Sequence, residues 1–165
     1  LHAFDSLRKH VPAARLTLVG GGRSAVELRT LADQLGLSEA ISFEGPVPFH
    51  RVVSYYQRCQ VFCLPSLGEP FGISLLQAMA CGKPVVSTQA GGVPGFVEHG
   101  LSGLLVSPSK PEELSAALQT LLEDPDLCLK MGTYNRQRCL SNHSWDSVVD
   151  QIEILYRSRI SSARA

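Results

Sequence analysis

Residues 64–94 read LPSLGEPFGISLLQAMACGKPVVSTQAGGVP, and this stretch predicts the fold of the chain. An apolar run at 61–64 indicates a buried strand that stops at a proline. We expect a helix from about Gly72 to Gly82, because glycine is well placed to cap a helix C-terminus. Pro84 then prevents the helix from resuming, and residues 85–88 form the next strand. A strand, loop, helix and strand in this order are typical of a parallel sheet.

The loop before this helix offers a place for an anion. The first N–H groups of a helix have no partner within it, and the aligned peptide dipoles place about half a positive charge there. We therefore expect a phosphate or pyrophosphate at Gly72, Ile73 and Ser74, where the glycine leaves room for a ligand. Glu69 would repel a phosphate, so it makes more sense beyond the phosphates, accepting hydrogen bonds from sugar hydroxyls. Gln77 is a second candidate for binding hydroxyls. The spacing alone also allows another interpretation, in which Glu69 only favours the helix start by its charge and Gln77 lies on a solvated face.

The motifs of this stretch resemble the signature of glycosyltransferase family 4, which are retaining enzymes of the GT-B fold that use nucleotide-sugar donors. The matching motifs are Glu-Pro-Phe-Gly at 69–72, Ala-Met-Ala-Cys-Gly at 78–82, Pro-Val-Val at 84–86 and Gly-Gly-Val-Pro at 91–94. The resemblance covers nearly the whole chain, from Ala3 to Tyr156. It implies an α/β fold, a Rossmann-like parallel sheet with helices on both faces, corresponding to the C-terminal half of a GT-B enzyme without its first strand.

The resemblance also implies roles for individual residues. In the family pattern a first glutamate binds hydroxyls of the donor sugar, and Glu69 fits it as the candidate catalytic residue, orienting the sugar rather than acting as a nucleophile. A second glutamate binds the ribose, but this chain has Gln77 there, which can still hydrogen-bond hydroxyls. It loses the charge-assisted part, roughly 1 kcal/mol. The other expected positions are Ser66, Phe71, Gly72, Ile73 and Ser74 for the sugar and diphosphate, Gly20 and Val47 for the nucleotide, and Gly91 and Gly92 in a loop near the donor.

The implied reaction moves a sugar from a nucleoside diphosphate to an acceptor hydroxyl and keeps the anomeric configuration, as in a hexosyltransferase. The leaving group is a pyrophosphate, so stabilising its growing negative charge is the main catalytic task. Amides at the helix start can share this charge, and we therefore expect neither a metal nor a cofactor. The expected partner is a UDP-, GDP- or ADP-sugar.

The composition is that of one globular domain, which we place at 1–165 with a C-terminal helix over 142–160. The 15 basic and 15 acidic residues balance, so no global field would attract nucleic acid or an anionic membrane. No apolar run approaches the ~20 residues of a membrane span. The five cysteines form no Cys-x-x-Cys pair, which favours free thiols in a reducing cytosol over a zinc site.

The first ten residues carry apolar groups at helical spacing and read as a helix already under way. In the family, the nucleotide-binding domain starts with a strand and a loop whose arginine and lysine contact the pyrophosphate. An acceptor-binding domain precedes it. We therefore expect this chain to be a fragment of a larger two-domain enzyme and inactive alone. The whole protein would be cytoplasmic, with any peripheral membrane contact made through the missing domain.

The remaining pattern predicts further elements. Strands are expected at 16–19, 41–45 and 103–106, helices at 24–35, 49–58, 112–122 and 124–140, and a short helical turn at 96–99. Ser109 and Glu112 look like a capping box. We expect the final helix to bury Val148, Val149, Ile152 and Leu155.

Three other functions compete with the transferase. A GT-B enzyme of another activity, such as a nucleotide-sugar epimerase, would share the pyrophosphate site but not the full motif block. A non-catalytic nucleotide-sugar-binding or interaction module would explain Gln77, and also Gly95, where the family usually has an acidic residue. A dinucleotide-dependent oxidoreductase is disfavoured, because the glycines at 20–22 lack the Gly-x-Gly-x-x-Gly spacing.

Overall fold

The computed structural model describes residues 1–162. The sequence predicts a frayed end from Ser161 to Ala165, but residues 161 and 162 belong to the last helix, and 163–165 lie outside the described residues. The strands are β1 Leu16–Val19, β2 Ile41–Gly45, β3 Phe62–Leu64, β4 Val85–Thr88 and β5 Gly103–Val106. The α-helices are α1 His2–His10, α2 Ala25–Gln34, α3 Phe49–Arg58, α4 Ile73–Ala80, α5 Pro111–Glu123, α6 Pro125–Asn142 and α7 Trp145–Ser162. Two short 3₁₀ helices are η1 Ser38–Ala40 and η2 Val93–Gly95.

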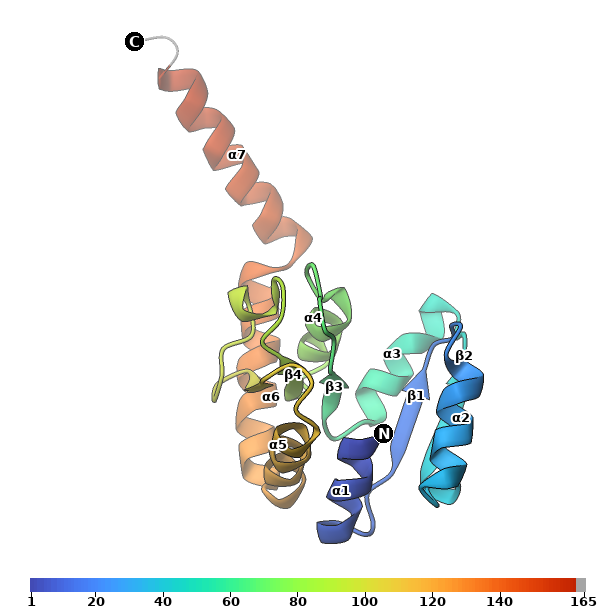
Figure 1. Ribbon diagram of the computed structural model, residues 1–165. Coiled ribbons are helices and arrows are strands. Elements are labelled where there is room, and N and C mark those ends of the chain that lie inside the picture. Colours follow the sequence, from blue (N-terminus) through green and yellow to red (C-terminus); the bar gives the residue numbers. More distant parts are fainter. Residues whose placement is uncertain (163–165) are drawn as a thin grey trace.

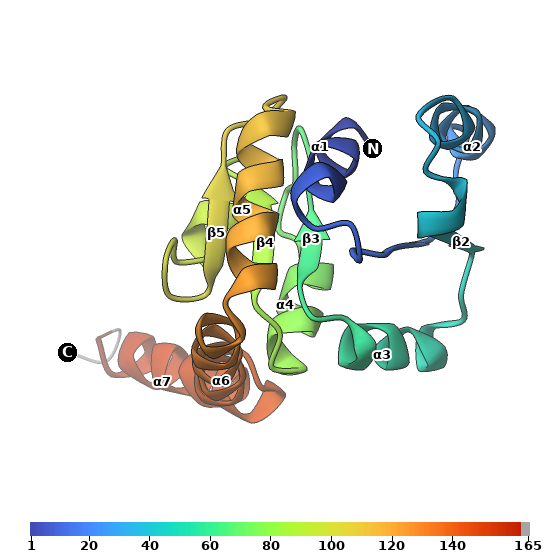
Figure 2. The ribbon, with the colours of Figure 1, turned by 90° about the horizontal axis from the view of Figure 1, so that it is seen from below.

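All strand pairs are parallel, as the alternation of strands and helices predicts. The strands form two sheets, β1–β2 and β3–β4–β5, and no strand pairing joins β1 to β3 within residues 1–162. Figures 1 and 2 show α1 between α5 and the β1–β2 pair. An apolar cluster connects the two parts, because Phe4 and Leu7 of α1 pack with Ile41 on one side and with Leu118 and Leu122 on the other.

Strand β4 lies at the centre of the larger sheet and is buried on both faces. Val85 packs with the α4 residues Leu75 and Met79, whereas its neighbour Val86 packs with Leu121 of α5 and Met131 of α6. Because successive side chains of a strand point to opposite faces, helices must cover both sides of this sheet. The expected Rossmann-like architecture is therefore confirmed.

The end of α4 follows the expectation from the sequence. Gly82 has φ 72°, a left-handed conformation that glycine adopts without strain. Its N–H donates to the Met79 carbonyl at 2.9 Å, and the Lys83 N–H reaches back to the Ala78 carbonyl at 3.1 Å. These two bonds define a Schellman motif, which satisfies carbonyls that the helix leaves free. The helix axis of α4 is thereby fixed relative to β4.

The expected capping box is wrong. Helix α5 begins at Pro111 after Lys110, and no side chain caps its first turn; a proline at the first position has no N–H that needs a partner. The carboxylate that reaches back belongs to Glu113, which accepts from the Ser107 N–H at 2.8 Å. The short turn expected at 96–99 lies instead at Val93–Gly95.

The prediction that the last helix buries its apolar face is also wrong. Val149, Ile152 and Leu155 are 56%, 47% and 58% exposed, and Val148 is only partly covered. Helix α7 runs away from the rest of the chain (Figure 1), so only its start lies near α6. An apolar stripe predicts that a helix face is covered, but it does not say by what. None of the helices within residues 1–162 is apolar over a length that would cross a bilayer.

We predict that Gly132→Ala destabilises the chain although alanine is the better helix former. A Cβ at Gly132 would lie 2.2 Å from the Gly82 carbonyl oxygen, where α6 crosses the end of α4. The loss should be about 1–3 kcal/mol of unfolding free energy despite a propensity gain of about 1 kcal/mol. Urea denaturation measures it. The exposed α6 change Thr133→Ala is the control, and a more stable Gly132→Ala variant would contradict the close crossing.

Candidate functional site

The loops that follow β3 (residues 65–72) and β4 (residues 89–92) meet at the carboxyl edge of the larger sheet. The Gly92 N–H donates to the Glu69 carbonyl at 2.9 Å, which joins the two loops through their backbones. In parallel α/β sheets, ligands bind at this edge, beyond the ends of the strands. The stretch that decides the fold therefore also carries the candidate site.

Two glycines allow this close approach of the loops. A Cβ at Gly91, whose φ is 57°, would lie 2.0 Å from the Glu69 carbonyl oxygen, and a Cβ at Gly92 would lie 2.3 Å from the Pro70 carbonyl oxygen. The resemblance implied that these glycines lie in a loop near the donor. In the structure, the backbone at 69–70 occupies the space where side chains at 91 and 92 would begin. This close contact explains why both positions are glycine. Their contact with a donor stays a prediction.

Glu69 is half-buried and its carboxylate lies at the start of α4. Oε1 accepts from the Gly72 N–H at 2.9 Å, so one of the three amides expected to face a ligand is already occupied. The N–H groups of Ile73 and Ser74 make no hydrogen bond to any residue within 1–162. Glu69 forms no ion pair in that part of the chain either, which leaves its second oxygen available to a ligand.

Gly72 is required by conformation and packing rather than by an open space. Its φ is 86° and it is buried, and a Cβ there would lie 2.9 Å from Leu75 and 3.3 Å from the Phe96 ring. Only glycine adopts this left-handed conformation easily. The residue thus turns the chain so that the carboxylate of Glu69 faces the helix start.

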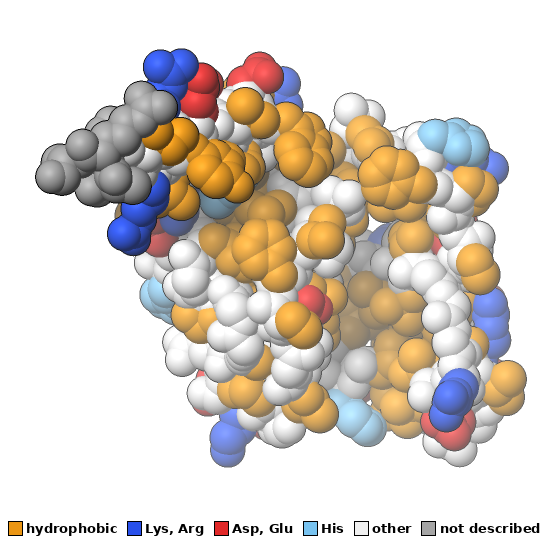
Figure 3. All heavy atoms as spheres, turned by 90° about the horizontal axis from the view of Figure 1, so that it is seen from above, with side chains coloured by type: hydrophobic (Ala, Val, Ile, Leu, Met, Phe, Trp, Pro, Cys, Tyr) orange, Lys and Arg blue, Asp and Glu red, His pale blue; other side chains and the backbone are white. Residues whose placement is uncertain are grey.

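The other predicted sugar and diphosphate residues surround this helix start. Ser66 is half-buried, and its carbonyl accepts from the Thr88 hydroxyl, which connects the end of β4 to the loop after β3. Phe71 and Ile73 are 50% and 64% exposed, and the Phe71 ring lies 5.3 Å from that of Phe96. Figure 3, which views this side of the molecule, shows apolar side chains gathered around a hollow. The site is therefore a polar helix start with an apolar border.

Gln77 lies one turn into α4 and faces α3. Its Oε1 accepts from the Tyr56 hydroxyl at 2.9 Å. Tyr56 is 7% exposed, and the local sequence does not reveal its contact with Gln77. The neighbouring Tyr55 is half-buried and instead donates its hydroxyl proton to Glu44 at 2.8 Å.

The two predicted nucleotide residues belong to the other sheet. Gly20 follows β1 and donates its N–H to the Gly45 carbonyl at 2.9 Å, and Val47 follows β2 and is half-buried. No hydrogen bond, ion pair or ring contact connects either of them to Glu69 or Gln77 within the described residues. Their role at a nucleotide stays a prediction.

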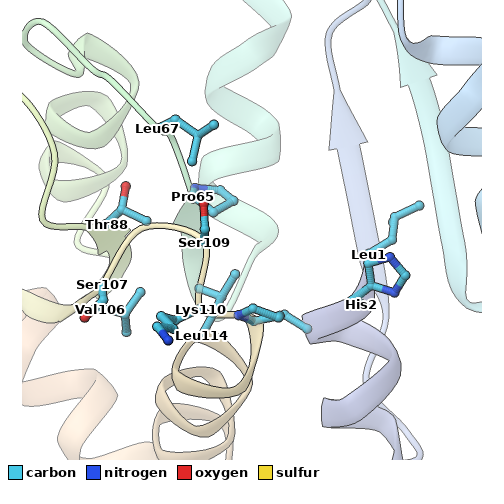
Figure 4. A pocket seen from close by; sticks show the side chains of 12 residues that line it. Leu1, His2, Pro65, Leu67, Thr88, Val106, Ser107, Ser109, Lys110 and Leu114 are labelled. Atoms are coloured by element: carbon cyan, nitrogen blue, oxygen red, sulfur yellow. The ribbon is translucent and has the colours of Figure 1, made fainter.

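A cavity of about 290 Å³ opens at the same edge of the larger sheet. Figure 4 shows side chains from the start of α1, the loop after β3 and the start of α5 around it. Pro65 and Leu67 supply apolar lining, Thr88 and Ser107 supply hydroxyls, and Lys110 supplies a positive charge. Nothing in the local sequence marks these residues, because they come together only when the strand ends align.

An anchor outside the predicted site holds the loop after η2. Arg138 of α6 lies 2.5 Å from the Glu98 carboxylate and donates to the Phe96 carbonyl at 2.9 Å. The Tyr134 hydroxyl also donates to Glu98, at 2.9 Å. Because Phe96 packs against Gly72, this network supports the start of α4 from behind.

Other candidate residues have structural roles. The Nδ1 of His99 accepts from the Leu105 N–H at 3.1 Å, and His99 forms an isolated parallel β-bridge with Gly103. The cysteines are free, and no group of histidine, cysteine and acidic residues within 1–162 has the arrangement of a metal site. Burial raises the pKa of Cys63 to about 12, so this thiol stays protonated at neutral pH.

A parallel α/β sheet with a helix start and a carboxylate at its carboxyl edge defines a Rossmann-like domain with a candidate ligand site at its strand ends. The family model described as Glycosyl transferases group 1 matches residues 1–138, and the chain belongs to this family. It is 38% identical to the D-inositol 3-phosphate glycosyltransferase of Corynebacterium jeikeium over 94% of this chain and 39% of that protein. The chain thus spans about two fifths of such a curated relative.

Solved structures agree with the sequence relatives. Sucrose-phosphate synthase from Thermosynechococcus elongatus superposes with a TM-score of 0.84 and 28% identity, over 98% of this chain and 42% of that one. Anabaena HepE in complex with UDP-glucose superposes with a TM-score of 0.79 and 29% identity, over 95% of this chain and 44% of that one. The recognised family and the expected GT-B fold are both confirmed.

We predict that Gly91→Ala strongly destabilises the candidate site. The added Cβ would meet the Glu69 carbonyl at 2.0 Å in a left-handed backbone conformation, and the loops would have to separate. We expect a loss of about 2–4 kcal/mol, measured by urea denaturation. Gly95→Ala is the matched control, because a Cβ there meets nothing within 4 Å. Equal stabilities of the two variants would show that the loop contact is not tight.

Proposed function

We propose that this chain is the donor-binding domain of a retaining, hexosyltransferase-type glycosyltransferase. It would bind a nucleoside-diphosphate sugar and present it to an acceptor hydroxyl. Membership of the Glycosyl transferases group 1 family and the likeness to a UDP-glucose complex support this proposal. The observation that carries it is the position of Glu69, whose backbone is fixed by Gly92 and whose carboxylate lies beside two open amides at the start of α4.

The proposed mechanism uses these groups in two ways. When the bond between the anomeric carbon and the diphosphate breaks, negative charge grows on the phosphate oxygens, and the Ile73 and Ser74 amides stabilise it. Glu69 accepts hydrogen bonds from the sugar hydroxyls through the oxygen that Gly72 leaves free. The bond to Gly72 prevents the carboxylate from rotating, so the sugar meets a group that is already oriented. In this proposal the amides take over the charge without a metal.

The acceptor site belongs, in this proposal, to another domain of the whole protein. The chain covers 39% of its Corynebacterium jeikeium relative and 44% of the HepE structure. Further positive charge at the diphosphate would also come from outside the groups described here, since the helix start supplies only partial charges. We therefore propose that the 165-residue chain binds the donor but does not catalyse transfer alone.

A non-catalytic nucleotide-sugar-binding module is the second candidate. Gln77 provides no carboxylate, and its carbonyl oxygen is already engaged by Tyr56, which weakens the case for full donor binding. Gly95 ends the short helix η2 and also has no charge to offer. Donor binding by the full-length protein without transfer to any acceptor would favour this candidate.

The role of Glu69 can be tested in the full-length protein. Glu69→Ala should lower kcat/KM for transfer by about 100-fold or more, because the sugar loses its orienting carboxylate. Glu69→Gln serves as a control for folding, since its amide oxygen can still accept from Gly72. Gln77→Glu should preserve or improve transfer. Transfer at the wild-type rate by Glu69→Ala would remove the role proposed for this residue.

The donor can be identified by a thermal-shift screen with UDP-, GDP- and ADP-sugars. A ligand that binds only the native state stabilises it by about 2.7 kcal/mol at 100 times its dissociation constant, so one base should raise Tm by several degrees. The 165-residue chain and the full-length protein are both screened. The absence of any shift in both would contradict donor binding.

A further inference from the structure

The hydrogen bond between α3 and α4 determines which end of the Gln77 amide faces outward. Tyr56 donates its hydroxyl proton to Oε1 at 2.9 Å. The tyrosine is 7% exposed, whereas Gln77 is half-buried. Because the amide is planar, binding its oxygen to the buried tyrosine turns the nitrogen away from it. Nε2 makes no hydrogen bond to any residue in the described part of the chain.

The tyrosine is itself held in place. Its ring meets Phe62 edge to face, with centroids 5.3 Å apart at 69°, and its carbonyl accepts from the Cys59 thiol at 3.2 Å. Burial is the main cause of a raised pKa at Tyr56, and nearby thiols add to it. The phenol therefore keeps its proton at neutral pH and donates it to the glutamine oxygen.

An amide nitrogen offers two donors and no acceptor. A glutamate at the same position would offer acceptors only, and one carboxylate could bind Tyr56 and a ligand hydroxyl together. The glutamine therefore does not merely weaken this position but changes the direction of the hydrogen bond. The group facing it has to accept.

We propose that Tyr56 is a positioning residue that holds the Gln77 amide with its nitrogen toward the nucleotide, so that an oxygen of the ribose accepts the hydrogen bond. This inference rests on the proposed function and adds the polarity of its nucleotide site. A ribose hydroxyl both donates and accepts, so it fits the glutamine as well as a glutamate. Glutamine and glutamate at position 77 therefore differ in affinity only for a ligand that can no longer donate or can no longer accept a hydrogen bond.

The test therefore compares three forms of the nucleotide in the full-length protein. Calorimetry first identifies which of UDP, GDP and ADP binds most tightly. That nucleotide is then compared with its 2′- and 3′-O-methyl ethers, which keep an acceptor but lose a donor, and with its 2′- and 3′-deoxy forms, which lose both. The variants are Tyr56→Phe and Gln77→Glu, with Tyr55→Phe as a matched control that removes a tyrosine hydrogen bond from the same helix.

We expect the ether to show the polarity directly. Gln77→Glu should lose about tenfold more affinity than the wild type when the hydroxyl is replaced by its methyl ether, because a carboxylate cannot pair with an ether oxygen. The bulk of the methyl group affects both proteins and cancels in this ratio. Equal tolerance of the ether by both proteins would overturn the inference, and this comparison does not depend on Tyr56→Phe folding well.

Tyr56→Phe should weaken binding of the parent nucleotide about threefold, because the amide is free to turn, and should leave the deoxy form at the contacted position unaffected. Tyr55→Phe should change neither. Equal weakening of parent and deoxy nucleotides by Tyr56→Phe would indicate a purely structural tyrosine and overturn the inference while the proposed function stands. Failure of all three nucleotides to bind the wild type would instead overturn the proposed function and the inference with it.

Discussion

The site depends on a contact between two backbones. The loops after β3 and β4 approach so closely that the carbonyls of Glu69 and Pro70 fill the positions where side chains of residues 91 and 92 would begin. The N–H of Gly92 then completes the contact with a hydrogen bond to Glu69. A carboxylate on a mobile loop would lose much of its value in ordering a hydrophilic sugar, since each ordered side chain costs conformational entropy. Here the contact between the two loops orders Glu69 during folding, so sugar binding does not carry this entropic cost.

This contact is supported by helix α6, far along the sequence. Arg138 binds the carbonyl of Phe96, and Asn135 donates to the carbonyls of Lys83 and Ser102, which flank β4 and β5. Asn135 is fully buried, and removing a buried donor would leave its acceptors without a hydrogen bond. Helix α6 thus holds the amino-terminal starts of β4 and β5 and the loop after η2 in one arrangement. The orientation of Glu69 is accordingly a property of the whole three-stranded part rather than of the motif alone.

The sequence was informative where structure is local and uninformative where it depends on a distant partner. Strand β4 and helix α3 were predicted with their observed bounds, since a proline stands directly before each of them. The cap at Gly82 was also predicted, because its signal lies within a few residues. The uncovered face of α7 and the lining of the cavity were not, since periodicity shows that a face is apolar but not which element meets it. The reason for Gly91 and Gly92 was missed for the same cause, because their neighbours lie some twenty residues earlier in the chain.

Gln77 shows why a departure from a motif should be judged in its surroundings. From the sequence alone, Gln77 replaces a charged acceptor by a neutral group and suggests a weakened site. In the structure its oxygen faces a buried donor in Tyr56, and the nitrogen is the end that has no partner among the described residues. A buried tyrosine beside a glutamine fixes the amide, whereas beside a glutamate it would share the carboxylate with the ligand. The same tyrosine therefore gives the two residues opposite hydrogen-bond directions, and a ribose hydroxyl, which can reverse its own role, is a group that accommodates both.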